Sequence, residues 1–394
     1  MRVLVSSTPG YGHVLPMLGL ARTLQRRGHD VLWATAADSC PLVRAAGVPA
    51  TAAGLTDAEA AGLRLAARRS VSGMPPELAP LFLFRRIFGR DRVEPMLAAL
   101  LPAATDWRPD LVLHEQGELA APLVATLLEV PHVNHSFGGP IPSVALAGAG
   151  EDVADLWLDR GLGVPPYAGS FEYLYLDICT PALRTVPLDH IPAVQAARPV
   201  TYDGEQAPEL GALLAGDDPR PLVYLTLGTV RNQVDLLSRV TAAMSTLDAR
   251  VLVTVGHDVD PMELGAQRSG VTVRRWVPQA AVLPHSSVVV SHGGSGTVLA
   301  AAAEGLPQVC LPQGADQFRN ADGVVRAGAG LALHPDAASP GAIVAAARAA
   351  LLDAGLRAGA ARVREEILAM PSPDEVVDRL EQVSREPTRP RRLA

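Results

Sequence analysis

Two histidines of this chain stand at predicted strand–helix junctions, where polar side chains can reach a ligand. His13 ends the loop T-P-G-Y-G-H, which follows an apolar strand-like run at 2–7 and opens a periodic helix through Arg27. Ligands collect at the carboxyl ends of strands in open α/β sheets. A helix N-terminus disfavours the imidazolium, so a neutral His13 could abstract a proton as a general base. An N-terminal helix residue hydrogen-bonded to a neighbour is the alternative, with about equal weight.

A carboxylate is predicted on the same edge of the sheet. Glu115 ends the strand-like run D-L-V-L-H-E at 110–115. It could accept the second ring N–H of His13 and balance the charge that develops when the ring takes a proton. A surface carboxylate at a strand end is the alternative. Strand alternation sends the neighbouring His114 to the opposite face.

The second histidine, His292, leads the glycine-rich loop H-G-G-S-G-T at 292–297. An apolar strand-like run at 286–291 precedes this loop, and a helix of small residues follows it. Backbone N–H groups and the positive end of a helix dipole then point at one spot, which suits a phosphate. A tight structural turn is the alternative, but the flanking strand and helix favour a nucleotide diphosphate. The loop residues that could contact it are Gly294, Ser295, Gly296 and Thr297.

Polar and aromatic residues flank this loop in the sequence. Trp276, before V-P-Q, could stack on a nucleotide base, although a core tryptophan fits nearly as well. Asp316 and Gln317 follow the strand-like run 307–312 and could hydrogen-bond sugar hydroxyls. Asp316 could equally act as a helix N-cap.

Composition narrows the class of protein. The 394 residues carry a net charge of −7, which argues against a general nucleic-acid binder. All 34 positive side chains are arginine, so a Walker phosphate loop is excluded. Neither a secretory signal nor a membrane-spanning run is evident, and we expect a cytoplasmic protein without stable membrane insertion. Three cysteines without metal-ligand spacing, Cys40, Cys179 and Cys310, are expected to be buried free thiols.

Strand and helix patterns alternate along the chain, which indicates the α/β class. After the polar stretch 201–221, the run P-L-V-Y-L-T-L-G-T at 221–229 restarts the opening pattern, so two similar halves are predicted. We expect domains at 1–205 and 206–371, with a C-terminal helix and tail at 372–394. Neither glycine loop has the G-x-G-x-x-G spacing, which disfavours an NAD-dependent oxidoreductase.

Aromatic residues of the first half are candidates for an apolar acceptor site. Residues 137–175 are predicted to be irregular, and a long irregular segment inside a domain is often functional. Each aromatic side chain could instead belong to the core. The candidates are Phe82, Phe88, Phe137 and Trp157.

Taken together, these motifs resemble the family 1 glycosyltransferases, in particular actinobacterial enzymes that decorate antibiotics and other natural products with nucleotide-activated deoxysugars. The resemblance implies the GT-B fold: two Rossmann-like domains facing each other across a cleft, with the C-terminal helix returning to the N-terminal domain. It also implies metal-independent, inverting transfer without a cofactor, from a nucleotide sugar to a hydrophobic aglycone, and is compatible with a homodimer. The motifs are G-Y-G-H at 10–13, P-D-L-V-L-H-E at 109–115, P-L-V-Y-L-T-L-G-T at 221–229, W-V-P-Q-A-A-V-L-P-H at 276–285, H-G-G-S-G-T at 292–297 and G-A-D-Q-F-R-N-A at 314–321.

The resemblance also implies a role for individual residues. His13 corresponds to the base and Glu115 to the carboxylate that supports it. Trp276 corresponds to the base-stacking residue, and residues 292–297 to the diphosphate loop. The remaining donor contacts are expected at Thr229, Val277, Gln279, Asp316 and Gln317.

Two departures from the family pattern bear on function. Many relatives that use UDP-sugars carry a glutamate eight residues after the loop histidine, where it binds both ribose hydroxyls; this chain has Ala300. Loss of that carboxylate costs less with deoxyribose, so a dTDP-sugar donor is expected. Glu115 stands where many relatives carry aspartate, which leaves its contact with His13 open. A non-catalytic partner of another glycosyltransferase is the alternative function.

Overall fold

The chain divides into two α/β units, each built around its own parallel sheet. The computed structural model describes residues 1–74, 79–201, 204, 210–214, 218–228, 234–256, 259–265 and 268–386. The first unit comprises Met1–Ile178, Val186–Ala197 and the segment from Pro371, and the second comprises Cys179–Thr185 and Arg198–Met370. The predicted boundary at 205/206 lies outside the described residues and stays a prediction.

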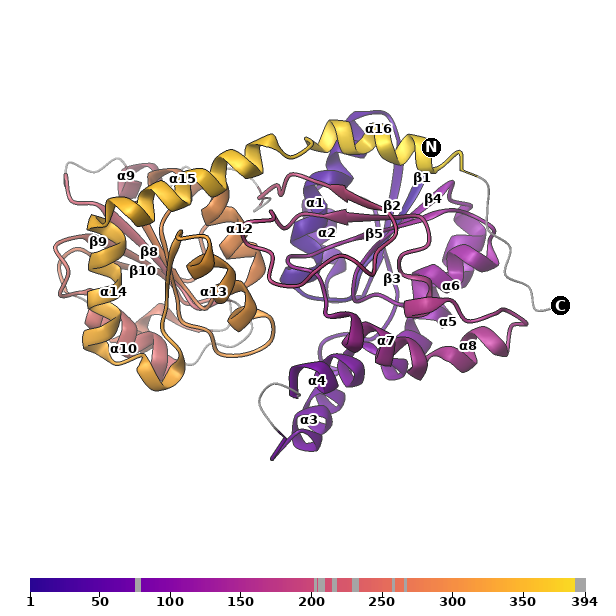
Figure 1. Cartoon of the computed structure of the whole chain (residues 1–394), viewed down its shortest axis with the longest axis horizontal. Coiled ribbons are helices and arrows are strands. Elements are labelled where there is room, and N and C mark those ends of the chain that lie inside the picture. Colours follow the sequence, from indigo (N-terminus) through magenta and orange to yellow (C-terminus); the bar gives the residue numbers. More distant parts are fainter. Residues whose placement is uncertain are drawn as a thin grey trace. The chain divides into compact units, whose positions relative to one another are not determined.

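The first unit is built on a seven-stranded parallel sheet with the order β3-β2-β1-β4-β5-β6-β7 (Figure 1). Apolar β-branched and leucine side chains fill its central strands, as expected for a parallel sheet covered on both faces. The strands are β1 (Arg2–Ser6), β2 (Asp30–Thr35), β3 (Ala50–Ala52), β4 (Leu111–Glu115), β5 (His132–His135), β6 (Leu174–Asp177) and β7 (Val194–Ala196).

Helices cover both faces of this sheet. Leu4 and Val112 share a core cluster with side chains of α5, α6 and α7. The helices of this unit are α1 (Tyr11–Arg26), α2 (Cys40–Ala45), α3 (Ala61–Ser70), α4 (Ala79–Phe88), α5 (Arg90–Trp107), α6 (Ala120–Leu127), α7 (Ser143–Asp152), α8 (Ala154–Leu158), the 3-10 turn η1 (Pro166–Gly169) and α16 (Pro373–Val383).

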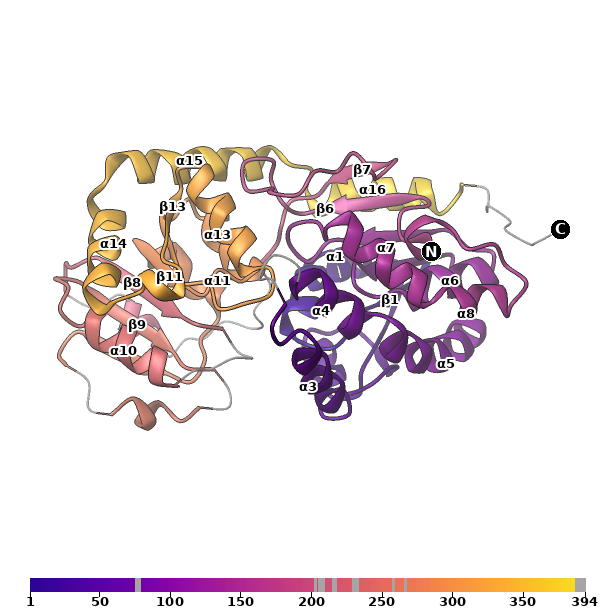
Figure 2. The ribbon, with the colours of Figure 1, turned by 60° about the horizontal axis from the view of Figure 1, so that its bottom comes forward.

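The second unit has a six-stranded parallel sheet with the order β10-β9-β8-β11-β12-β13 (Figure 2). Side chains of β8 alternate between two cores: Val223 packs with α10 and α14, whereas Tyr224 packs with α11 and α12. The strands are β8 (Leu222–Thr226), β9 (Arg250–Thr254), β10 (Val271–Arg274), β11 (Val288–Ser291), β12 (Gln308–Cys310) and β13 (Gly330–Ala332). The helices are α9 (Gly211–Leu214), α10 (Val234–Met244), η3 (Pro261–Leu264), α11 (Gln279–Val282), η4 (Leu283–His285), α12 (Ser295–Ala303), α13 (Gln317–Arg326), η5 (Pro335–Ala337), α14 (Pro340–Leu352) and α15 (Ala354–Ala369).

Both sheets reverse their strand order at one point. The reversal falls between β1 and β4 in the first unit and between β8 and β11 in the second. Loops that leave neighbouring strands at such a point diverge and leave a crevice at the carboxyl ends. The candidate residues of the sequence, in the loops after β1, β4, β8 and β11, therefore gather at the two reversal points.

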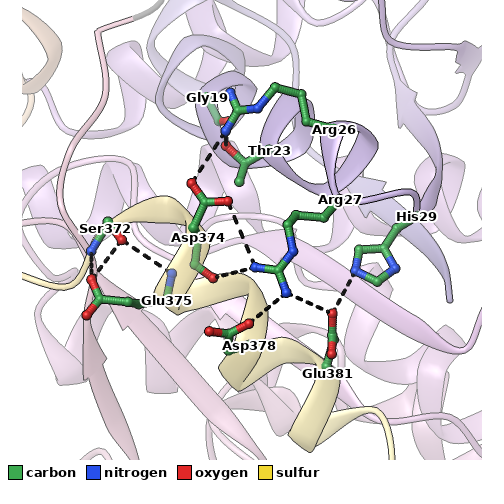
Figure 3. A network of polar contacts seen from close by, with 10 residues as sticks. All are labelled: Gly19, Thr23, Arg26, Arg27, His29, Ser372, Asp374, Glu375, Asp378 and Glu381. Atoms are coloured by element: carbon green, nitrogen blue, oxygen red, sulfur yellow. Dashed lines mark hydrogen bonds and ion pairs between the residues drawn. The ribbon is translucent and has the colours of Figure 1, made fainter.

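The C-terminal helix α16 packs against α1 of the first unit. Its buried face is apolar, and its polar face meets Arg27 and His29 (Figure 3). A capping box at Ser372 and Glu375 begins the helix, which fits the sequence pattern S-P-D-E. The predicted α/β class and the return of the C-terminal helix to the N-terminal domain are confirmed; the predicted cleft stays a prediction.

Candidate active site

His13 and Glu115 come together at the reversal point of the first sheet. Gly10, with φ 109°, turns the chain from β1 into α1 and places His13 in the first helical turn. The His13 Nδ1 atom lies 3.2 Å from Glu115 Oε1. This distance is within ion-pair range, although the two groups are not aligned for a straight hydrogen bond. The longer glutamate side chain therefore reaches the histidine.

Glu115 is fully buried at the end of β4, and hydrogen bonds fix both of its oxygens. The Thr8 hydroxyl donates to Oε1 at 2.6 Å, and the Gly117 backbone N–H donates to Oε2 at 2.5 Å. Burial alone would raise the pKa of this carboxyl, but the nearby His13 ring, with the hydrogen bonds from Thr8 and Gly117, holds the pKa below its usual value. Glu115 is thus an ionised, oriented partner for the imidazole.

Two phenylalanines flank the His13 ring. The ring centroid of Phe137 lies 4.8 Å away, edge-on, and that of Phe88 lies 5.5 Å away. Phe82 lies on α4, where the Arg86 guanidinium stands over its ring. Trp157 is fully buried, since 0% of its surface is accessible to solvent. Among the four acceptor candidates, the structure brings Phe88 and Phe137 to His13, and the burial of Trp157 disfavours a contact with substrate.

The neighbouring His114 takes no part in this contact. Its Nε2 lies 3.1 Å from His132 Nδ1, and its Nδ1 lies 3.2 Å from the Glu115 carbonyl oxygen. Burial lowers the pKa of His114 to about 3, so this ring is neutral. Its position agrees with the strand alternation that directed it away from His13.

In the second unit, His292 is enclosed by glycine backbone. A side chain on either Gly228 or Gly294 would collide with the His292 ring, because its Cβ would lie within 3 Å of the ring atoms. The Nδ1 atom is inaccessible and has no hydrogen-bond partner among the described residues, and burial lowers the pKa of the ring. The His292 ring therefore packs closely against the glycine backbone of the loops after β8 and β11.

Hydrogen bonds join the other loops of this edge to residues 292–297. Gln279 Nε2 donates to Thr297 Oγ1 at 3.2 Å, and Ser295 Oγ donates to Asp316 Oδ2 at 2.7 Å. Asn320 Nδ2 then donates to Asp316 Oδ2 at 3.0 Å and to the Gly293 carbonyl at 2.9 Å. Asp316 stands at the N-cap position of α13, but its side chain makes no capping bond. Its carboxylate instead fixes the glycine loop.

The remaining donor candidates occupy different environments. Trp276 is 39% exposed, as a stacking platform requires, whereas Val277 is buried in a cluster that includes Ala300. Gln317 Oε1 accepts hydrogen bonds from the backbone N–H groups of Gln313 and Gly314. Gly296 lies in the first turn of α12. Thr229 lies outside the described residues.

Some residues of these sites escaped the sequence reasoning. Thr8 fixes Glu115, and Asn320 fixes the glycine loop. Thr8 lies in the motif 8–13 and Asn320 in the motif 314–321, so their closeness in sequence to His13 and Asp316 could have indicated them. Arg92 and Glu118 line a hollow beside the His13–Glu115 pair. The sequence does not indicate them, because their position near the pair depends on tertiary packing.

Three further features concern the cysteines, the length of the helices and possible metal ligands. Cys40, Cys179 and Cys310 are free and buried, as predicted. Over the described ranges, no helix is long and apolar enough to cross a membrane. The same part of the chain holds no group of three histidine, cysteine or acidic side chains arranged for a metal ion.

Comparisons with known proteins cover nearly the whole chain. Residues 22–228 match the family described as "Erythromycin biosynthesis protein CIII-like, N-terminal domain", and residues 238–383 match the corresponding C-terminal domain. L-demethylnoviosyl transferase of Streptomyces niveus is 35% identical over 390 residues, covering 96% of this chain and 97% of that protein. Elloramycin glycosyltransferase ElmGT of Streptomyces olivaceus is 34% identical over 401 residues, with the same two coverages, 96% and 97%.

Solved structures give the same result. Glycosyltransferase VinC in complex with dTDP superposes with a TM-score of 0.81 at 25% identity, covering 98% of this chain and 99% of that chain. Spinosyn rhamnosyltransferase SpnG complexed with spinosyn aglycone superposes with a TM-score of 0.78 at 26% identity, covering 97% and 100%. The similarity spans both units and confirms the predicted GT-B architecture.

Proposed function

Because the chain belongs to the erythromycin biosynthesis protein CIII-like family and is a glycosyltransferase, we propose that it transfers a deoxysugar from dTDP to a hydroxyl of a hydrophobic natural-product aglycone. The transfer inverts the anomeric centre and needs no metal. The contact between His13 and the buried, ionised Glu115 is the observation that carries the proposal. Relatives named for binding dTDP and an aglycone support the substrate classes.

The orientation of His13 assigns a task to each ring nitrogen. Nδ1 faces Glu115, so Nε2 is the nitrogen that takes the proton of the acceptor hydroxyl. The acceptor oxygen then forms a bond to the anomeric carbon as the bond from that carbon to the diphosphate oxygen breaks. The leaving dTDP keeps the electron pair, and Glu115 stabilises the imidazolium.

The second unit is assigned to the donor. Backbone N–H groups at the N-terminus of α12 and the helix dipole stabilise the negative charge that grows on the diphosphate as it leaves. The bonds of Ser295 and Asn320 to Asp316 hold this loop in one conformation before the substrate arrives. Such preorganisation lowers the barrier because the donors need not reorient during the reaction.

Replacement of the base tests the proposal. We expect His13→Ala to lower kcat by roughly a thousandfold, since general-base catalysis contributes about 10²–10⁴-fold. Binding of dTDP, measured by calorimetry, should stay unchanged because the donor residues lie in the second unit. His334→Ala, at an exposed histidine of the second unit, serves as the matched control.

Two results would contradict the proposal. Near-normal sugar transfer by His13→Ala would remove the base assignment. Failure of the isolated wild-type protein to transfer or hydrolyse a dTDP-sugar would instead favour a non-catalytic partner of another glycosyltransferase.

A further inference from the structure

A small hollow with a cavity volume of about 20 Å³, half open to solvent, lies beside the His13–Glu115 pair in the first unit. It is connected to that pair through two residues, because Thr8 binds Glu115 and Phe88 contacts the His13 ring. Its wall is otherwise mostly apolar, with one positive charge, Arg92. The lining residues that matter here are Thr8, Leu55, Phe88, Arg92, Met96 and Glu118.

Arg92 lacks the carboxylate partner that neighbouring arginines have. Arg85 makes two hydrogen bonds to Asp152, at 2.6 and 2.7 Å, and Arg90 pairs with Asp155. Among the residues the structure describes, no carboxylate lies within ion-pair distance of the half-buried Arg92 guanidinium. Asp57, Glu115 and Asp38 attract it only over longer distances, and Arg64 repels it.

The position of Arg92 makes its charge costly. It lies in the first turn of α5, where the helix dipole disfavours a cation. Burial also lowers the pKa of its guanidinium, because it removes water from the charge. The other charged group of the hollow, Glu118, is already used by the Ser6 hydroxyl and the backbone N–H groups of Ala120 and Ala121. An anionic group of a bound ligand is therefore a suitable partner for Arg92.

One aromatic ring connects Arg92 with the base. The Arg92 guanidinium carbon lies 5.9 Å from the centre of the Phe88 ring, and the His13 ring lies 5.5 Å from the same centre. A flat acceptor on this aromatic wall could present a hydroxyl to His13 and a second group to Arg92. A planar guanidinium is suited to a carboxylate, which it binds through two parallel hydrogen bonds.

We propose that Arg92 is a specificity-determining residue that binds a carboxylate of the acceptor at the hollow beside His13. The inference rests on the proposed function, since it names the chemical class of aglycone that this site selects. An acceptor of that class would enter with its charge on Arg92 and its ring on Phe88.

The test compares two fluorescent probes that differ at one carboxyl group, the charged 7-hydroxycoumarin-3-carboxylate and its neutral ethyl ester. Fluorescence titration without a donor measures their Kd values for the full-length wild type, Arg92→Met, Arg92→Lys and Arg68→Met. Methionine keeps much of the apolar stem of arginine but removes the charge. Arg68, on the exposed face of α3, is the matched control.

We expect the wild type and Arg68→Met to bind the acid more tightly than the ester. Arg92→Met should weaken acid binding by about tenfold or more, as loss of a charge-assisted hydrogen bond does, with little change for the ester. Acid binding by Arg92→Lys should be weaker than in the wild type and stronger than in Arg92→Met, and it shows whether a positive charge alone suffices. This variant also keeps the test informative if Arg92→Met does not fold. Equal binding of acid and ester by the wild type, or equal losses for both in Arg92→Met, would overturn the inference. Because no donor is present, failure of sugar transfer would sink the proposed function without affecting this result.

Discussion

Two glutamates of the first unit show how strongly the surroundings decide the chemistry of a residue. Glu115 and Glu118 lie three positions apart and are both buried. A histidine and a threonine hydroxyl contact Glu115, and its pKa is lowered. No cation contacts Glu118 among the described residues, and burial raises its pKa to about 7. The sequence alone shows two similar carboxylates, because only tertiary packing distinguishes their environments.

The pKa of Glu118 leads to a prediction about stability. A carboxyl whose pKa is about 7 in the folded protein and about 4.5 in the unfolded chain binds its proton more tightly when folded. The stabilisation that comes from protonated Glu118 is therefore complete below about pH 4.5 and is lost as the pH rises from there to about 7. The loss amounts to at most about 3 kcal/mol, since one pKa unit corresponds to about 1.4 kcal/mol.

Glu118→Gln should remove this dependence, because a glutamine does not titrate. We expect the melting temperature of the variant, relative to wild type, to rise between pH 5 and pH 8 in thermal denaturation. Glu115 has a lowered pKa, so its contribution to stability is lost only at acid pH. Between pH 5 and pH 8 the comparison therefore reports on Glu118. A difference between the two proteins that stays constant over this range would contradict the assignment.

At the scale of elements, strands were more predictable from the sequence than helices. The apolar runs before the candidate loops are β1, β4, β8 and β11, and their shared edge follows from parallel pairing alone. The segment 137–175, predicted to be irregular, instead contains α7 and α8. Helix α7 is rich in glycine, which lowers helix propensity. Its glycines permit close contacts: Gly148 meets Arg85 of α4, and Gly150 meets the backbone at Ala168. Tertiary packing outweighs local propensity there.

Helix α16 allows packing and ion pairing to be compared within one element. Arg27 pairs with Asp378 at 2.7 Å and with Glu381 at 3.4 Å, while His29 Nε2 lies 3.1 Å from Glu381 (Figure 3). These charges face solvent, so salt screens them and their contribution is small. The opposite face of the helix buries its apolar side chains completely or nearly so: Val376, Val377, Leu380 and Val383.

We therefore expect packing to dominate the attachment of α16. Leu380→Ala should lower the free energy of unfolding by about 2–5 kcal/mol, because it leaves a cavity under the helix. Arg27→Met should have a much smaller effect that disappears in high salt. Urea denaturation at low and high ionic strength measures both variants. A larger loss for Arg27→Met than for Leu380→Ala would show that the ion pairs hold the helix.

Over the whole molecule, two sheets of similar topology carry different halves of the chemistry. Each sheet places its polar loops where the strand order reverses, yet the first collects the proposed base and its carboxylate and the second the proposed phosphate-binding loop. This division was predictable because each motif follows its own strand. The proposed acceptor site was not predictable in full, because it combines side chains from separated helices, such as Phe88 of α4 and Arg92 of α5, whose burial no local pattern reveals.

The donor half offers a test of nucleotide preference through the stability of the whole protein. A ligand that binds only the native state raises stability by RT ln(1 + [L]/Kd), which is about 2.7 kcal/mol at a concentration of 100 Kd. Ala300 is buried on α12 in the cluster that contains Val277, next to the stacking candidate Trp276. Its short side chain leaves no carboxylate there to bind a ribose diol, so dTDP should raise the melting temperature more than an equal concentration of UDP.

Ala300→Glu should narrow or reverse this preference, because the new carboxylate can accept hydrogen bonds from both ribose hydroxyls. Burial of a glutamate should also lower the melting temperature without ligand, so the measured quantity is the shift that each nucleotide produces in the same variant. Ala303→Glu, one turn further along α12, controls for the added charge. A larger shift with UDP than with dTDP in the wild type would refute the assignment of a dTDP donor. An unchanged preference in Ala300→Glu would show that the deoxyribose is selected by other residues of the second unit.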